Sequence, residues 1–420
     1  MRPPATPCPA PLDGGAAIAY WMPMPFAALV SLSCATLVLN LLAFMTVAAV
    51  LPELIAAWSL SSTEAGWLGG SFFAGYVVAV PVVMALTDRI APKRIFIAGA
   101  LVGAVASLGF AALADGLWSG IAFRLLTGVG VAGTYMPGLR CLADRLEEPQ
   151  RSRATSYYTS IFALGTALSI WVGGAAAEWL NWRWAFGLAG AGHLAGLALG
   201  WAVLPAGRAS TGTGPRHLLD FRPVLRNGAA MRNVLVYFTH TWEVFAYRVW
   251  LVTFLVFVEA QQGARFFVSP VAVAMLVALA GVPASMAFGE LAARRNRRRA
   301  TIALMVASVA AGVMLGLASG WPLWMVVALA VLFGMTCYGD TGAVTAGTVA
   351  LADPQLRGAT MAVHAAVGFL GGVAGPLAVG VTLDLAGGIA SPQGWGWAFA
   401  VMAAGSAAGA VLMAGGRTAR

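Results

Sequence analysis

The sequence predicts an all-α membrane protein built from two six-helix bundles, and three observations support this prediction. First, 60% of the 420 residues are hydrophobic and only 10% are charged, whereas soluble domains carry about 25% charged residues. Second, the chain contains twelve apolar stretches of the length that spans a bilayer, which is about 20 residues. Third, the second half of the chain repeats segments of the first.

The twelve apolar stretches are expected to be helices, because a backbone in lipid finds no water and must satisfy its own hydrogen-bonding groups. The 51 glycines of the chain fit this arrangement, since small residues let membrane helices approach closely. In chain order, the predicted spans cover residues 26–50, 64–86, 95–114, 117–140, 154–177, 184–204, 233–257, 268–289, 300–319, 322–348, 360–383 and 396–414.

The basic residues are divided unequally between the loops on the two sides of the predicted membrane. Of the 25 Lys and Arg residues, 21 fall in the two tails and the even-numbered loops, whereas the odd-numbered loops hold only Arg183 and Arg265. Cytoplasmic loops carry such an excess, so the sequence predicts a multi-pass protein of the cytoplasmic (inner) membrane with both termini in the cytoplasm. Because the net charge of +9 follows this topology, we expect the lipid bilayer as a partner and no nucleic acid.

The second half of the chain repeats the first. The segment "PQRSRAT" at 149–155 returns as "PQLRGAT" at 354–360, and "WRWAF" at 182–186 returns as "WGWAF" at 395–399. Matches in the same order predict two homologous six-helix bundles related by a pseudo-two-fold axis. The predicted units are a cytoplasmic tail at 1–25, a first bundle at 26–204, a cytoplasmic linker at 205–232, a second bundle at 233–414 and a tail at 415–420.

The loop between the second and third spans and a motif in the fourth span resemble those of major facilitator superfamily (MFS) transporters. The loop "MALTDRIAPKR" at 84–94 is similar to the family's G-x-L-a-D-R-x-G-R-[RK], although Met84 and Ala91 stand where the family has glycine. In the fourth span, "RLLTGVG" at 124–130 fits the family's R-x-x-x-G-x-G. The resemblance covers the whole chain and implies an MFS fold with twelve transmembrane helices that transports by alternating access.

The resemblance also implies a gate on the cytoplasmic side. In the family, the acid of the loop motif, here Asp88, is thought to lock this side against the start of the eleventh helix, near Gly358 in this chain. Arg89 and the acid at the end of the fourth helix, Asp144, are expected to assist. An acid can do so because it accepts hydrogen bonds from the exposed donors at a helix N-terminus. In the second half Ala293 replaces the Asp, so the lock is expected only in the first half.

The segment "FTHTWEVFAYRVW" at 238–250 places charged residues inside the seventh predicted span. Glu243 is expected about 15 Å from the cytoplasmic start of this span, at about 1.5 Å per residue, and therefore close to the midplane. His240, Glu243 and Tyr247 follow at spacings of three and four residues, which predicts one shared helix face. A charge at the bilayer centre costs at least about 2.5–3.5 kcal/mol. We therefore expect Glu243 and Arg248 to face other helices or a water-filled cavity.

In the family that the chain resembles, the first, fourth, seventh and tenth helices line a central cavity, and polar residues of this chain fall on those helices. We expect substrate binding by Arg124, Arg248, Asn40 and Tyr247. We expect proton coupling at Glu243, Asp340 and His240. An Arg can bind a carboxylate through two parallel hydrogen bonds, and a buried acid can take up and release a proton as the cavity opens and closes. A structural role, in which both Arg pair with acids and His240 bonds a carbonyl, stays open.

The sequence therefore predicts a secondary active transporter of a small-molecule substrate, an organic anion or similar metabolite, by proton-coupled symport. Na⁺ is the alternative coupling ion, and a proton-coupled efflux antiporter for drugs or metabolites is the alternative mode. The second alternative is a membrane sensor that does not transport. Since HExxH, GxxxxGK[ST] and GxSxG are all missing, we expect no enzyme activity, no cofactor and no metal site. The chain is expected to act as a monomer.

Overall fold

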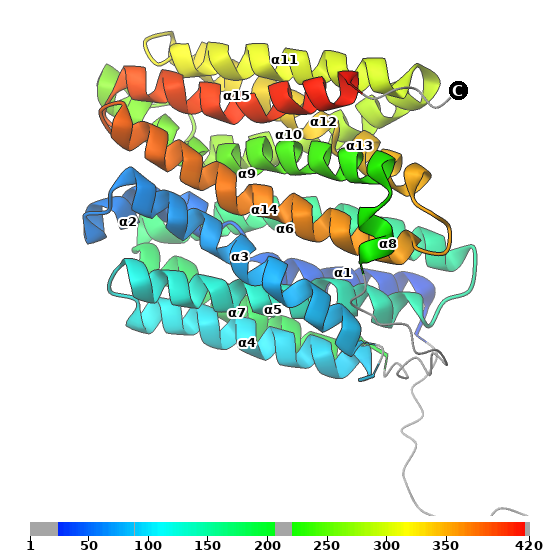
Figure 1. Cartoon of the computed structure of the whole chain (residues 1–420). Coiled ribbons are helices and arrows are strands. Elements are labelled where there is room, and N and C mark those ends of the chain that lie inside the picture. Colours follow the sequence, from blue (N-terminus) through cyan, green and yellow to red (C-terminus); the bar gives the residue numbers. More distant parts are fainter. Residues whose placement is uncertain (1–23, 88, 206–220, 416–420) are drawn as a thin grey trace, which may run out of the picture.

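The structure, a computed structural model, describes residues 24–87, 89–205 and 221–415. The regular secondary structure of these residues is helical, as Figure 1 shows. The first half contains α1 (Phe26–Leu41), α2 (Thr46–Trp58), α3 (Ser62–Leu86), α4 (Pro92–Leu113), α5 (Leu117–Ala143), α6 (Gln150–Trp179) and α7 (Trp182–Val203). The second half contains α8 (Arg222–Leu225), α9 (Gly228–Gln262), α10 (Pro270–Arg294), α11 (Arg297–Leu317), α12 (Leu323–Gly339), α13 (Thr341–Leu351), α14 (Arg357–Leu385) and α15 (Pro392–Ala414).

The long helices of the described residues make twelve spans, because α1 and α2 together form the first and α12 and α13 the tenth. Eleven of these spans are long and apolar enough to cross a membrane. The remaining one, α5, is 27 residues long, which corresponds to about 40 Å, and it packs against α3 and α4. The predicted all-α membrane fold is confirmed.

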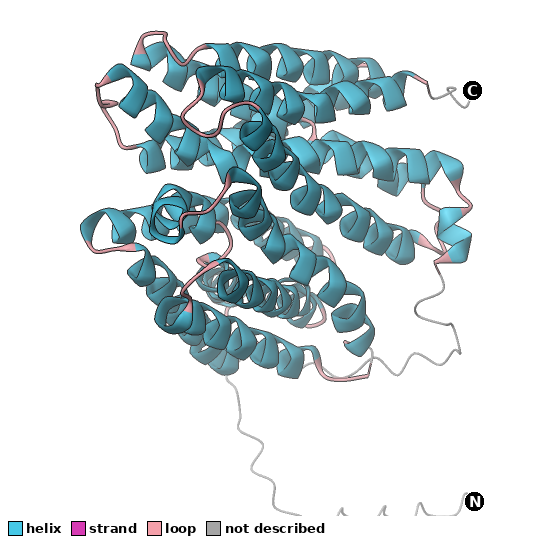
Figure 2. Ribbon diagram, turned by 60° about the vertical axis from the view of Figure 1, so that its left-hand side comes forward, coloured by secondary structure: helices cyan, strands magenta, loops and turns pink. Residues whose placement is uncertain are grey.

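The spans form two bundles, coloured blue to teal and green to red in Figure 1. The bundles contact each other where α3 packs against α14, α2 against α9, and α6 against α10. Figure 2 shows the same two bundles from another side, with short loops between the helices. We call the face where α7 ends and α9 begins the linker side, and the opposite face the far side.

Side-chain caps set several helix boundaries. At the start of α3, Ser61 Oγ accepts a hydrogen bond from Glu64 N (3.2 Å) while Glu64 Oε2 accepts one from Ser61 N (2.8 Å). At α9, Asn227 Oδ1 accepts a bond from Ala230 N (3.1 Å). A cap of this kind satisfies backbone donors that the first helical turn leaves free. The Asn227 cap lets α9 begin at Gly228, whereas hydropathy predicts a start near residue 233.

Two spans that the sequence predicts as continuous helices are interrupted. The first is broken at 42–45, between α1 and α2, and the tenth at Asp340, between α12 and α13. At membrane depth, backbone leaves the helix only where the protein itself supplies the missing hydrogen bonds. In the first span, Met45 N donates to Ser169 Oγ of α6 (3.1 Å), and α5 supplies a further partner, described below. Hydropathy does not report such tertiary partners, so the pattern alone predicted unbroken helices.

Candidate substrate and coupling sites

Arg124 of α5 binds the break in the first span. Its Nη1 donates to Ala43 O (2.8 Å) and its Nη2 to Phe44 O (3.1 Å). The guanidinium also lies over the ring of Phe72, 4.9 Å from the centroid. The side chain is buried and its Nε has no hydrogen-bond partner. The sequence assigned Arg124 to the substrate; in this structure two of its nitrogens hold the unwound backbone and the third is unused.

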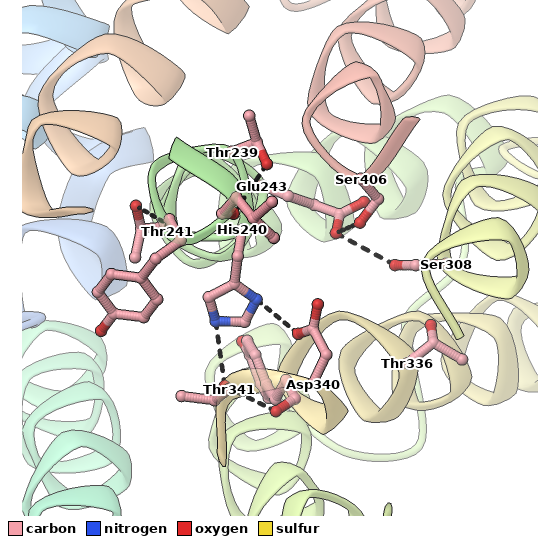
Figure 3. Close-up of polar contacts among 12 residues, drawn as sticks. Thr239, His240, Thr241, Glu243, Ser308, Thr336, Asp340, Thr341 and Ser406 are labelled. Carbon is pink, nitrogen blue, oxygen red and sulfur yellow. Dashed lines mark hydrogen bonds and ion pairs between the residues drawn. The ribbon is translucent and has the colours of Figure 1, made fainter. Parts of the chain in front are cut away.

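His240 of α9 and Asp340 form a buried pair at the break in the tenth span. His240 Nδ1 lies 2.6 Å from Asp340 Oδ1, and both side chains are only 3–4% exposed. Figure 3 shows the other ring nitrogen, Nε2, directed at Thr341 Oγ1 (3.0 Å). The Thr341 hydroxyl donates to Tyr338 O (2.8 Å), which leaves its lone pairs free to accept from Nε2. The carboxylate, imidazole and hydroxyl together can therefore hold a proton.

Glu243 lies on the same helix as His240 but points into a different part of the bundle. Its carboxylate accepts hydrogen bonds from Ser308 Oγ of α11 (3.2 Å) and from Ser406 Oγ of α15. The side chain is fully buried, and Oε1 has no partner. Figure 3 shows His240 directed instead at Asp340. The three-residue spacing thus places both groups inside protein, but it does not bring them together.

Tyr247 and Arg248 complete the polar residues of this segment. The Tyr247 hydroxyl donates to Ala330 O of α12 (2.7 Å), and its ring is fully buried. The Arg248 guanidinium lies over Tyr338 (4.6 Å to the centroid) and Phe245 (5.6 Å). Arg248 is partly buried, and its Nε has no hydrogen-bond partner. Aromatic faces therefore surround this cation.

An aromatic cluster separates the two arginines where the bundles meet. Phe44 packs against Phe72 (5.1 Å between ring centroids) and Phe245 (6.3 Å). Phe73 packs against Phe245 at 4.2 Å. Because Arg124 lies over Phe72 and Arg248 near Phe245, one guanidinium stands on each side of the cluster. Within the described part of the chain, neither makes an ion pair with a carboxylate, so the expected Arg–acid pairing is not formed there.

Asn40 of α1 is satisfied within the first bundle. Its Oδ1 lies 2.8 Å from His193 Nδ1 of α7, and its Nδ2 donates to Thr36 O (2.7 Å). Asn40 and His193 are both fully buried. The predicted substrate residue Asn40 is therefore placed against α7 in this structure, in a contact that the sequence did not indicate.

The residues predicted to form the gate lie at the linker side. Asp88 is outside the described residues, and Arg89 is exposed in the turn that follows α3. Asp144 Oδ2 lies 3.7 Å from Arg140 Nε one turn earlier in the chain. Arg140 Nη1 in turn donates to Thr87 Oγ1 (2.6 Å). These contacts join the linker-side ends of α3 and α5.

A different acid joins the two bundles at the far side. Asp384, near the end of α14, accepts hydrogen bonds from Ser62 N (2.8 Å), Thr63 N (2.8 Å) and Thr63 Oγ1 (2.6 Å) at the start of α3. An acid at a helix N-terminus bonds free backbone donors and interacts favourably with the helix dipole. Sequence analysis missed Asp384, although the argument used for Asp88 applies equally to an acid at the end of the eleventh span.

The far side also contains a cavity between the two bundles. Its volume is about 590 Å³, and its lining comes from α2, α6, α9, α10 and the loop before α10. Glu53, Glu178 and Glu259 contribute three carboxylates to this lining, and Arg265 contributes one guanidinium. At the wall of the cavity, α6 and α10 pack so closely that a side chain at Gly174 would overlap Val271. The cavity is therefore an acidic recess closed on one side by the contact between α6 and α10.

Comparisons with known proteins agree with this architecture. Residues 33–376 match the family model described as Major Facilitator Superfamily. Over 124 residues the chain is 35% identical to the uncharacterized MFS-type transporter YwoD of Bacillus subtilis, covering 29% of this chain and 27% of that protein. Over 161 residues it is 27% identical to human protein spinster homolog 1, covering 38% of this chain and 30% of that protein. The matches span less than a third of the length of these relatives.

Solved structures share the fold over nearly the whole chain. A bacterial homolog of the human lysosomal transporter Spinster, in an inward-facing and unoccupied conformation, superposes with a TM-score of 0.74 at 17% identity. The match covers 93% of this chain and 95% of that chain. The nucleoside transporter NupG superposes with a TM-score of 0.73 at 13% identity, covering 93% and 98% of the two chains. Likeness at such low identity concerns the fold.

Two packed six-helix halves with broken helices and buried polar groups are the architecture of membrane proteins built from internal repeats. The chain belongs to the Major Facilitator Superfamily, which confirms the resemblance seen in the sequence, and its described residues form a multi-pass membrane protein.

Proposed function

We propose that this chain is a proton-coupled symporter that carries a small carboxylate-bearing metabolite across the cytoplasmic membrane as a monomer. The main support is the buried pair of His240 and Asp340, 2.6 Å apart at a break in a membrane span. Transporters place their substrate and coupling-ion sites near the midplane, at helices that are interrupted there.

Proton coupling is assigned to Asp340 and His240, with Glu243 as a second acid. Ionisable residues inside a membrane are costly and are characteristic of proton relays. Histidine changes its charge within the physiological pH range, and here it contacts both a carboxylate and a hydroxyl. Glu243 is buried between serine hydroxyls from two other helices, which suits a group that is neutral in one state and ionised in another.

The assignment of an anionic substrate rests on Arg124 and Arg248. Both guanidiniums lie near the contact between the bundles, and neither makes an ion pair among the described residues. Each has an Nε without a hydrogen-bond partner. A carboxylate beside either guanidinium would accept a charge-assisted hydrogen bond from its free Nε. Asn40 and Tyr247 remain proposed contributors, acting through rearrangement of their present bonds to His193 and Ala330.

Alternating access would use two acids at opposite ends of α3 and α14. Asp384 bonds the start of α3 at the far side. We infer that Asp88, assisted by Arg89 and Asp144, makes the equivalent contact with the start of α14 when the linker side is closed. We infer from the basic tails and loops that the linker side faces the cytoplasm. Domain limits at 26–204 and 233–414 define the two halves that rock against each other.

Efflux of cationic compounds is the second candidate function. The far-side cavity of about 590 Å³ supports it, because Glu53, Glu178 and Glu259 give this cavity an acidic lining. In that mode the acids at mid-depth would exchange protons for the cationic substrate. The two functions predict ligands of opposite charge, so ligand binding separates them.

The test is a thermal-shift screen of the purified protein with small carboxylates, other anions, amino acids, sugars and lipophilic cations at about pH 5.5 and about pH 7.5, on either side of the histidine titration range. A ligand at about 100 times its Kd stabilises the folded state by about 2.7 kcal/mol. Stabilisation by a carboxylate that is stronger at the lower pH supports symport. Stabilisation by cations alone supports efflux, and ligand binding without transport in proteoliposomes indicates a sensor.

A further inference from the structure

Polar side chains form a column between Asp340 and the linker side of the second bundle. On α13, three threonines follow one another at spacings of four and three residues, and on α9 an Asn, a Tyr and a His do the same. The two stripes are Thr341, Thr345 and Thr348 on α13, and Asn233, Tyr237 and His240 on α9. Residues at these spacings share one helix face, and α9 packs against α13. Polar residues inside membrane spans are costly and mark ion or proton pathways, so two facing polar stripes in otherwise apolar spans indicate such a pathway.

His364 of α14 connects the lower part of the two stripes. Its Nδ1 lies 3.1 Å from Thr348 Oγ1, and its Nε2 lies 3.5 Å from Thr345 Oγ1. Thr348 Oγ1 also accepts a hydrogen bond from Asn233 Nδ2 (2.8 Å). Both ring nitrogens of His364 therefore contact hydroxyls, one on the linker-side turn of α13 and one a turn closer to the midplane. An imidazole held in this way can accept a proton at one nitrogen and release one from the other.

Tyr237 lies between the two histidines of the column. Its ring stacks on His364 at 3.9 Å between centroids with a 16° interplanar angle, and on His240 at 5.7 Å with a 19° angle. This stack fixes the orientation of both imidazoles. Thr345 and Thr341 of the column are separated by about one turn of α13, or about 6 Å along the helix axis. One bridging water can span such a gap.

Few ionisable groups other than His240 lie close enough to His364 to exchange protons with it. From α9, Tyr237 and His240 face it. The helices α13 and α15 carry no Asp, Glu, Lys or Arg, and α8 carries only Arg222, at the linker side. Among the described residues of α3 the single carboxylate, Glu64, lies at the far side, and on α14 itself the charged residues Arg357 and Asp384 lie at the two ends. His364 is 3% exposed and Thr348 is fully buried, so both side chains are shielded from bulk water.

We propose that His364 is a proton relay that connects the linker side with the coupling pair of His240 and Asp340. This proposal rests on the proposed proton-coupled function. A proton that enters at Thr348 binds His364 Nδ1, and the proton on Nε2 leaves to Thr345, so the imidazole returns to its starting charge after it changes tautomer. In the tautomer of His240 that carries its proton on Nδ1, the Thr341 hydroxyl turns from Tyr338 O to give its proton to Nε2 and takes the incoming proton in exchange. The proton on Nδ1 then passes to the ionised Asp340.

The test follows protonation of Asp340 by time-resolved infrared spectroscopy after a pH jump on the purified full-length protein in detergent. The carboxyl band of Asp340 is identified by its loss in Asp340→Asn. We compare the rate at which this band develops in the wild type, in His364→Gln and in Thr348→Val. Gln retains the bonding capacity of His364 without its proton exchange, and Val is nearly isosteric with Thr. The matched control is His193→Gln, another buried histidine, which bonds Asn40 outside the column.

The relay predicts that His364→Gln slows the Asp340 band by about tenfold or more, as the loss of a proton-transfer group does, while its final amplitude is unchanged. Thr348→Val is expected to slow it as well, and His193→Gln to leave it unchanged. Wild-type rates in both His364→Gln and Thr348→Val would overturn the relay and leave proton coupling at Asp340 intact. If the wild type shows no band that Asp340→Asn removes, proton coupling at Asp340 is wrong, and the relay is wrong with it. Thermal unfolding confirms that each variant is folded.

Discussion

The imidazole Nδ1 of His240 lies 2.6 Å from Oδ1 of Asp340, at the point where the tenth span leaves its helical path. The first bundle contains a related arrangement, in which Arg124 binds the carbonyls of Ala43 and Phe44 at the break in the first span. In each half, a polar side chain from another span contacts the point where one span is interrupted. The broken span is the first span of the first bundle (α1 and α2) and the fourth span of the second bundle (α12 and α13).

Neutralising the coupling acids should separate accumulation from exchange. In proteoliposomes loaded with the ligand found in the screen, we expect Asp340→Asn and Glu243→Gln to abolish accumulation driven by a pH gradient. Exchange of labelled for unlabelled ligand should continue, because it requires no net proton movement. Glu290→Gln, an exposed acid paired with Arg294, is the control and should accumulate normally. Undiminished accumulation in Asp340→Asn would rule out this residue as the coupling site.

Removing the Arg248 guanidinium should weaken anion binding with little effect on folding. The guanidinium lies over the aromatic faces of Tyr338 and Phe245, and such contacts contribute about 0.5–2 kcal/mol. We therefore expect Arg248→Gln to raise the Kd for the carboxylate by tenfold or more, since a charge-assisted pair is lost. Titration calorimetry measures the Kd, and Arg265→Gln at the far side is the control. An unchanged Kd in Arg248→Gln would show that the substrate binds elsewhere.

Replacing Arg124 by lysine should destabilise the break in the first span. Lysine keeps the charge but cannot bond Ala43 O and Phe44 O with two nitrogens in one plane. Each lost bond from a charged donor costs about 1.5–3 kcal/mol, so Arg124→Lys should lower the unfolding temperature in detergent. The matched variant is Arg183→Lys, because Arg183 donates one bond, to Ala111 O, from an exposed position. Equal unfolding temperatures for Arg124→Lys and wild type would mean that the break does not depend on this side chain.

Removing the Asp384 carboxylate should favour opening of the far side. Asp384→Ala loses three hydrogen bonds to Ser62 and Thr63, and a loss of about 1.4 kcal/mol is enough to raise the open fraction about tenfold. Spin labels at Asp115 and Gly320, exposed in far-side loops of the two bundles, report the separation by pulsed electron resonance in a cysteine-free background. Asp353→Asn, an acid at the linker side, is the control. Identical distance distributions in Asp384→Ala and wild type would contradict a gating role.

Adding a methyl group at Gly128 should disrupt the crossing of α3 and α5. A Cβ at Gly128 would overlap Phe72 O, and such overpacking costs about 1–3 kcal/mol. A Cβ at Gly187 in α7 would meet nothing within 4 Å, so Gly187→Ala is the matched control. We expect Gly128→Ala to lower the unfolding temperature and Gly187→Ala to leave it unchanged or raise it slightly. Similar melting of the two variants would show that α3 and α5 can separate without cost.

The amino-acid sequence by itself determined the number and order of the spans. Length, apolar composition and the repeated segments are local properties, and a span of about 20 apolar residues has no stable alternative to a helix in lipid. It also identified Arg124, His240, Glu243 and Asp340, since a charge inside an apolar stretch is visible in the sequence. The family motifs at 84–94 and 124–130 were sufficient to indicate the superfamily.

Only the tertiary structure decided which of these side chains meet. The sequence placed His240 and Glu243 on one helix face, whereas the structure directs one to Asp340 and the other to serines of α11 and α15. It also decided where spans break and that Asp384 joins the bundles. Arg124 lies 80 residues from Phe44, and Asp384 lies 322 residues from Ser62. Such contacts depend on the packing of whole helices, because a buried polar group takes the nearest partner that the neighbouring helices present.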